Sequence, residues 1–255
     1  MRRTLGFHLA RHSFLVSVLL CGLAAAPALL PMGAHAATVQ GSGTAATETR
    51  SVAEFQAIGL SGSMDLVVRQ GAQQSVQVQA DDNLLPLLET VVESGRNGAT
   101  LHVRWKKWQN LNTRSKVLVT VVVPKLTGLA ASGAGDIRLE TFNTPMLNLS
   151  LSGSGEAKLD GLTTDELGVR IAGSGNVSGK GSAGRIKISI AGSGDVQLLD
   201  LRSDEVTVSI AGSGDAAVNA QKSLSVSIAG SGDVVYTGNA QVKSSVAGSG
   251  SVTKK

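Results

Sequence analysis

Acidic or amide side chains recur directly after a Gly-x-Gly motif through the second half of this 255-residue chain. Successive copies lie 20, 20, 19, 20 and 18 residues apart. A constant period near 20 residues is typical of stacked structural units, so these side chains would form one row with neighbours about 5 Å apart. Because Ca²⁺ prefers carboxylate oxygens, the row raises the hypothesis of a calcium site at Asp195, Asp215 and Asp233. The whole row consists of Asp136, Glu156, Asn176, Asp195, Asp215 and Asp233.

A purely structural role is the other interpretation of this row, and we favour it. Calcium-binding β-rolls use a nine-residue Gly-Gly-x-Gly-x-Asp repeat, and both the period and the spacing differ here. Two carboxylates about 5 Å apart repel by roughly 3 kcal/mol at an effective dielectric constant of 20, but by less than about 1 kcal/mol in water. We therefore expect the side chains to face water and to accept hydrogen bonds from amides of the glycine turns.

Both tryptophans of the chain lie in one cationic segment, Arg104-Trp105-Lys106-Lys107-Trp108. Aromatic rings among cations suit a sugar polymer, an anionic glycan or a membrane interface. This makes Trp105, Lys106, Lys107 and Trp108 the candidate ligand-binding residues. The competing interpretation, which we favour because partly buried tryptophans are common, is that the tryptophans cover the exposed end or flank of the stack while the cations are solvated.

No motif marks a catalytic site. The Gly-Ser-Gly turns lack the strand–loop–helix context and the lysine of a phosphate-binding loop. Ala134 replaces the serine in one copy, which argues against a required hydroxyl. There is no Gly-x-Ser-x-Gly motif, and His102 is the single histidine after residue 36, so acyl-transfer chemistry lacks partners. A polysaccharide-active enzyme remains an alternative, because glycosidases use carboxylate pairs and the row contains several.

Residues 1–36 have the pattern of a secretory signal peptide. Arginines precede an apolar run over residues 14–30, and Ala34-His35-Ala36 forms a small-x-small cleavage site. The run is shorter than the roughly 20 residues that a membrane span requires. We predict cleavage after Ala36, a mature chain without a transmembrane segment, and export to the periplasm, the cell surface or the medium.

Removal of the signal also changes the charge. Three of the 23 basic residues and none of the 19 acidic residues lie in it, so the formal net charge falls from +4 to +1. Nucleic-acid binding therefore has no global electrostatic support. Cys21 leaves with the signal, so the mature chain has no disulfide and no cysteine metal site.

Period-2 alternation of apolar and polar residues flanks every Gly-x-Gly over residues 128–255. Each period thus contains a strand, a glycine turn, a second strand and a looser turn. One such unit cannot bury its apolar row alone, whereas stacked copies join the rows into a core. The repeat therefore predicts an all-β fold, a parallel and right-handed β-helix or β-solenoid with coils of about 18–20 residues. A β-sandwich is the competing fold, but it does not require one turn sequence at constant phase.

The first part of the chain carries weaker signals. Residues 37–50 are rich in Gly, Ser, Thr and Ala and predict a flexible lead-in. Residues 51–127 predict further β coils, with Ser61-Gly-Ser-Met-Asp65 as a degenerate copy of the repeat and with a short helical or turn insertion around Pro86. We expect residues 51–127 to form one continuous domain with residues 128–255.

Several motifs resemble those of one bacterial family. They are Phe-x-x-Ile-x-Leu-Ser-Gly-Ser at residues 55–63, Asp-Asn-Leu-Leu at 82–85, Val-x-Val-Pro-x-Leu at 121–126 and the Ser-Gly-x-Gly-Asp repeats. Over residues 51–253 the chain resembles the putative autotransporter adhesins with a head GIN domain. The resemblance implies a right-handed β-helix-like fold and no established activity. The chain ends without a pattern typical of a membrane barrel, so periplasmic residence or another release route is as well supported as surface display.

The sequence as a whole predicts a non-enzymatic, exported β-solenoid that binds or spaces a glycan or another component of the cell envelope. A polysaccharide-active β-helix enzyme and a Ca²⁺-stabilised structural repeat are the alternatives.

Overall fold

The computed structural model describes residues 38–95, 98–107 and 110–255. The predicted signal peptide over residues 1–36 and the candidate residue Trp108 lie outside the described residues. The described residues form one compact unit. In the described part of this unit, every regular element is a strand except for one 3-10 turn, η1 (Leu85–Leu87). The predicted all-β class is confirmed.

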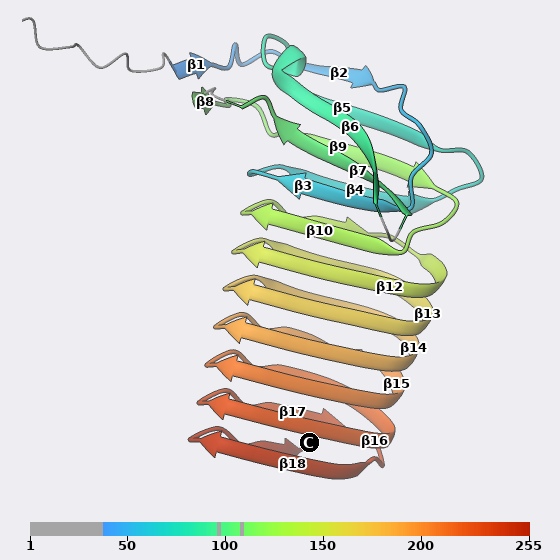
Figure 1. Cartoon of the computed structure of the whole chain (residues 1–255), viewed down its shortest axis with the longest axis vertical. Coiled ribbons are helices and arrows are strands. Elements are labelled where there is room, and N and C mark those ends of the chain that lie inside the picture. The colour runs from blue at the N-terminus through green and yellow to red at the C-terminus, as the bar shows by residue number, and fades with distance from the viewer. Residues whose placement is uncertain (1–37, 96–97, 108–109) are drawn as a thin grey trace, which may run out of the picture. The chain divides into compact units, whose positions relative to one another are not determined.

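The strands from residue 128 onward stack as parallel coils (Figure 1). Equivalent residues pair at constant phase, so that Ile171 lies beside Ile190, which lies beside Ile210. These side chains are at most 2% exposed, and such inner rows form the core. The predicted parallel β-solenoid is therefore confirmed. Its strands are β10 (Gly128–Gly133), β11 (Ile137–Leu139), β12 (Phe142–Gly153), β13 (Glu156–Gly173), β14 (Asn176–Gly192), β15 (Val196–Gly212), β16 (Ala216–Gly230), β17 (Val234–Thr237), β18 (Gln241–Gly248) and β19 (Val252–Lys254).

The Gly-x-Gly motifs form the tight corners between the two sheets of the stack. Gly192 has a φ of +132°, in the region that favours glycine. A Cβ on Gly192 would lie 2.3 Å from the carbonyl oxygen of Gly173 in the neighbouring coil. The glycines are thus required by backbone conformation and by the close approach of successive coils.

Two further coils precede the repeat in the stack. The strands β3 (Ala57–Ser61) and β4 (Asp65–Gln70) pair in parallel with β10 and β11. Next to them, β7 (Gly98–Trp105) pairs with β3, and β9 (Leu118–Val123) pairs with β4. The degenerate copy at residues 61–65 is therefore a corner of the same stack. In the β7–β9 coil, the described residues 106–107 and 110–117 stand in place of this corner, and we call them the corner insertion.

Antiparallel strands cover the β7–β9 end of the stack (Figure 1). The strand β5 (Ser75–Asp81) pairs with β9, β2 (Ala45–Thr49) pairs with β5, and β6 (Leu88–Gly95) pairs with β7. In addition, β1 (Thr38–Gln40) pairs in parallel with β8 (Asn110–Asn112). Residues 38–40 and 45–49 of the predicted lead-in thus lie in strands, and the flexibility expected over residues 37–50 stays a prediction. The hydrogen bonds that β5 and β8 offer at their edges hold this polar segment without an apolar pattern of its own.

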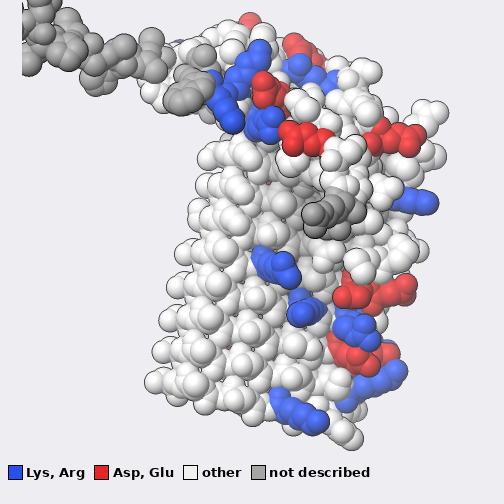
Figure 2. Space-filling model, viewed as in Figure 1, with Lys and Arg blue, Asp and Glu red and all other residues white. Residues whose placement is uncertain are grey.

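One outer face of the repeat carries small side chains next to the corner. The outward position before the first glycine is always serine or alanine, and the next outward position is mostly serine. Figure 2 shows a wide area of this face without Lys, Arg, Asp or Glu. The small residues are Ser132, Ser152, Ala172, Ala191, Ala211, Ala229 and Ala247.

Candidate functional site

Trp105 lies where the β7–β9 coil departs from the glycine corner. Arg104 pairs with Ser61, so Trp105 comes beside Gly62 of the adjacent coil. A Cβ on Gly62 would lie 3.4 Å from Cδ1 of the indole ring. The ring is half-buried and packs against the core. Trp105 thus covers part of the core, as one interpretation of the sequence expects, while one side of its ring stays exposed.

That exposed side of Trp105 borders a polar hollow of about 590 Å³. An aromatic wall with convergent hydroxyl and amide groups is the combination that orients a ligand which is apolar on its faces and polar at its edge. A sugar ring has this character. The hollow is lined by Thr38, Ser63, Trp105, Asn110, Leu111, Asn112 and Thr113.

The two backbone segments around the hollow are held together by hydrogen bonds. The amide of Gly41 donates to the carbonyl oxygen of Asn112 at 2.8 Å. The Nδ2 atom of Asn112 donates to Oε1 of Gln40 at 2.9 Å. These contacts continue the β1–β8 pairing and fix the hydroxyl and amide side of the hollow relative to Trp105.

Asp81 is buried at the base of this arrangement. Its Oδ1 accepts from the amide of Gly43 at 2.9 Å and from Oγ of Ser115 at 2.7 Å, and its Oδ2 accepts from the amides of Arg114 and Ser115 at 2.8 and 3.2 Å. Burial raises the pKa of Asp81, but the hydrogen bonds from Ser115, Arg114 and Gly43 outweigh it and lower the pKa to about 2. Sequence reasoning missed Asp81, since a single acid at a strand end carries no recognisable signal.

The structure brings together only part of the predicted tryptophan–lysine site. Trp105 lines the hollow, whereas Lys106 and Lys107 follow it as exposed residues of the corner insertion. The amide of Lys106 donates to the carbonyl oxygen of Leu87 at 2.9 Å. The polar residues from β1 and β8 were not predicted, because their approach to Trp105 depends on a non-local pairing.

Apart from Glu156, the acidic row is a ladder of hydrogen bonds between coils; at Glu156 the amide of Asn176 donates instead to the carbonyl oxygen of Gly155 at 3.1 Å. Oδ1 of Asp195 accepts from the amide of Asp215 at 3.0 Å, and Oδ1 of Asp215 accepts from the amide of Asp233 at 2.7 Å. Asn176 takes the same part, because its Oδ1 accepts from the amide of Asp195 at 3.1 Å. The ladder therefore needs a side-chain acceptor and not a charge.

Metal binding has no additional support from the geometry. In the ranges that the structure describes, no three His, Cys, Asp or Glu side chains come together in an arrangement able to hold a metal ion. Calcium binding at Asp195, Asp215 and Asp233 stays a prediction.

Comparison with protein families places most of the solenoid in a known group. Residues 54–240 match the family described as "Putative auto-transporter adhesin, head GIN domain". The chain belongs to the head GIN domain family. The matched range includes Trp105, the corner insertion and most of the repeat. No match was found among curated proteins.

Solved structures share the fold of this head GIN domain. A "putative adhesin" from Bacteroides fragilis is 25% identical, with a TM-score of 0.77 over 85% of this chain and 100% of that one. A "putative adhesin" from Parabacteroides distasonis is 25% identical, with a TM-score of 0.68 over 86% and 100%. A "putative lipid binding protein" from the same organism is 24% identical, with a TM-score of 0.71 over 86% and 100%, and shows the fold alone. No helix among the described residues is long and apolar enough to cross a membrane.

Proposed function

We propose that this head GIN domain is a non-enzymatic, exported binding module that holds a sugar unit of a cell-envelope glycan in the hollow beside Trp105. The observation that carries the proposal is the half-exposed indole ring facing the hydroxyl and amide groups of β1 and β8. Sugar rings stack their apolar faces on such rings and turn their hydroxyl groups toward polar neighbours.

The lysines of the corner insertion favour a glycan that carries negative charge. Lys106 and Lys107 are exposed, and neither forms an ion pair with another described residue. Their charges are therefore available to acidic groups on a polymer that continues beyond the hollow. The adhesin names of the structural relatives are consistent with binding at an envelope surface.

Export is the second part of the proposal. The signal pattern over residues 1–36 supports it, since arginines, an apolar run and a small-x-small site occur in the order that export requires. N-terminal sequencing of the protein recovered from the cell envelope tests this part. A start at Ala37 is expected, and a retained Met1 would contradict cleavage.

Binding and turnover are separated by one experiment on the purified protein. A glycan array reports binding, and release of reducing sugar is measured on the glycans that bind. We expect binding without release, weakened about tenfold by Trp105→Ala and by Asn110→Ala through lost stacking and hydrogen bonding. Lys187→Ala, on the outer face of the repeat, is the matched control and should bind like the wild type.

Two results would contradict the proposal. Unchanged binding by Asn110→Ala and Trp105→Ala, with melting curves like that of the wild type, would remove the hollow as the site. Sugar release that is lost on Asp-to-Asn changes along the acidic row would instead establish a polysaccharide-active enzyme. Asn110→Ala keeps the test informative if the half-buried Trp105 proves necessary for folding.

A further inference from the structure

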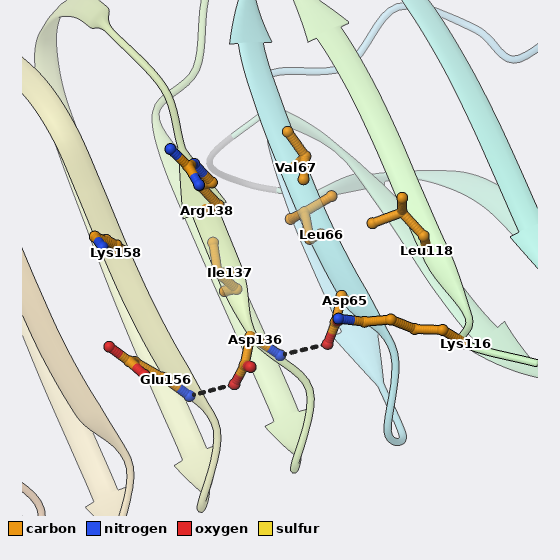
Figure 3. Close-up of a pocket in the computed structure, with 10 residues that line it drawn as sticks. All are labelled: Asp65, Leu66, Val67, Lys116, Leu118, Asp136, Ile137, Arg138, Glu156 and Lys158. Carbon is orange, nitrogen blue, oxygen red and sulfur yellow. Dashed lines mark hydrogen bonds and ion pairs between the residues drawn. The ribbon is translucent and has the colours of Figure 1, made fainter.

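A second hollow, of about 330 Å³, lies on the outer face of the sheet that contains β9, β4, β11 and β13 (Figure 3). It is separate from the Trp105 hollow, since the two share no lining residue. The half-buried side chains of Val67 and Leu118 give it an apolar side. Charged side chains of both signs complete it.

Carboxylates gather at the corner end of this hollow. Lys116 forms an ion pair with Asp65, and the hydrogen bond that Lys116 donates to this carboxylate raises the pKa of Lys116, as does the nearby charge of Asp136. Asp136 and Glu156 have no ion-pair partner among the described residues. Oδ1 of Asp136 accepts a hydrogen bond from the amide of Glu156 at 3.0 Å. Negative charge therefore remains at this end (Figure 3).

Cations occupy the other end of the hollow. Arg138 Nη2 lies 2.9 Å from Oδ2 of Asp160. Lys158 is exposed, and it forms no ion pair with a carboxylate of the described residues. Figure 3 shows Arg138 and Lys158 together at one end, with Asp136 and Glu156 at the opposite end. The hollow is thus dipolar along the strand direction.

The register sets the backbone spacing between the residues of the two charged ends. Arg138 pairs with Lys158 across β11 and β13. Asp136, directly before β11, and Glu156, the first residue of β13, precede them by two residues. All four side chains are exposed and point outward from the same face. Two residues of a parallel strand span roughly 6.6 Å. An extended dipeptide spans about 7 Å, whereas a single amino acid spans about half of that.

We propose that this hollow binds short peptides of about two residues that carry a free amino terminus and a free carboxyl terminus. The ammonium group lies at Asp136 and Glu156, and the carboxylate lies at Lys158 and Arg138. An apolar side chain of the peptide packs on Val67 and Leu118. This ligand class follows from charge complementarity at both ends together with the apolar side between them.

The test is an NMR or calorimetric titration of the purified protein with the dipeptide Gly-Leu. N-acetyl-Gly-Leu and Gly-Leu-amide, which each lack one charge, are the matched probes. We expect Gly-Leu to bind and each blocked probe to bind about tenfold more weakly, because a charge-assisted hydrogen bond is lost. Glu156→Gln and Lys158→Met should weaken Gly-Leu binding similarly, and the exposed control Lys187→Met should not.

Three outcomes would overturn the proposal. They are the absence of Gly-Leu binding at millimolar concentration, equal binding of the free and blocked dipeptides, and binding that survives both Glu156→Gln and Lys158→Met. Trp105→Ala should leave Gly-Leu binding unchanged. Failure of the peptide site and failure of the proposed glycan site are therefore separate results.

Discussion

At the scale of single residues, Asp81 decides how the first strands meet the corner insertion. Its two oxygens accept four hydrogen bonds from Gly43, Arg114 and Ser115. Gly41 is required beside it, because a Cβ there would lie within 2.1 Å of Oδ2. One buried carboxylate thereby fixes both segments of the Trp105 hollow.

Replacement of Asp81 by asparagine should lower the melting temperature at neutral pH by several degrees, because an NH₂ group would then face backbone N–H donors. The pKa of Asp81 falls from 3.8 to about 2 on folding. The charged form therefore stabilises the fold fully above about pH 4, and this contribution is lost as the pH falls toward 2. Melting curves of both proteins between pH 7 and pH 2 check this. A difference that does not shrink in acid would contradict it, and Asp82→Asn, on an exposed neighbour, is the control.

The acidic row makes a prediction at the same scale. Asp215→Asn keeps the acceptor for the amide of Asp233, as Asn176 does for Asp195, and should leave the melting temperature nearly unchanged. Asp215→Ala removes the acceptor and should cost about 0.5–1 kcal/mol. Melting curves with Ca²⁺ and with chelator decide the calcium hypothesis in the same samples. Stabilisation by Ca²⁺ that Asp215→Asn abolishes would favour the metal site over the ladder.

At the scale of elements, the coil formed by β18 and β19 carries an exposed sheet edge. Val242 and Val246 are 36% and 40% exposed, whereas their partners Leu224 and Ile228 are 1% and 2% exposed. Ser244 pairs with Val226, and Lys254 pairs with Tyr236, so polar residues stand at inner positions of this coil. Inward polar and charged residues of this kind discourage edge-to-edge association.

The double variant Ser244→Val, Lys254→Val should therefore associate through the edge of this coil and sediment faster than the wild type. Lys243→Val with Ser245→Val places the same residue types on the outer face and serves as the control. Sedimentation velocity distinguishes the species. Equal behaviour of the two double variants would show that the inner positions do not protect the edge.

Sequence reasoning succeeded for elements that the chain repeats. The glycine corners and the inner Ile and Val rows were predictable, because each position recurs at constant phase and any one copy confirms the others. The buried hydroxyl groups of the looser turns were missed, although Thr144 and Ser203 hydrogen-bond to carbonyl oxygens near the turn. Threonine, alanine and serine alternate there in different copies, so no fixed pattern marks them.

The candidate site was predictable only in its aromatic part. Trp105 stands out by type, but its partners on β1 and β8 come from segments about 70 residues apart. That pairing occurs once and depends on Asp81, so no repeated sequence pattern predicts it. The dipolar hollow was missed for the same reason, because Lys116 and Leu118 reach β4 and β11 only through the stacking of the β7–β9 coil.

At the scale of the whole molecule, the domain combines a regular stack of coils with one irregular coil. The repeat supplies a rigid support in which each coil is held by backbone hydrogen bonds to its neighbours. The corner insertion replaces one tight glycine turn and opens a hollow there. The proposed glycan site thus lies on the coil that departs from the repeat, as binding loops commonly do on regular scaffolds.

The fluorescence of Trp105 tests this account most directly. Trp108→Phe leaves Trp105 as the single tryptophan of the chain, and a glycan that binds on the array is then titrated into this variant. We predict a saturable blue shift of the emission, because a stacked sugar ring displaces water from the indole. Saturable binding in a parallel calorimetric titration without any change in the emission would contradict a glycan site at Trp105.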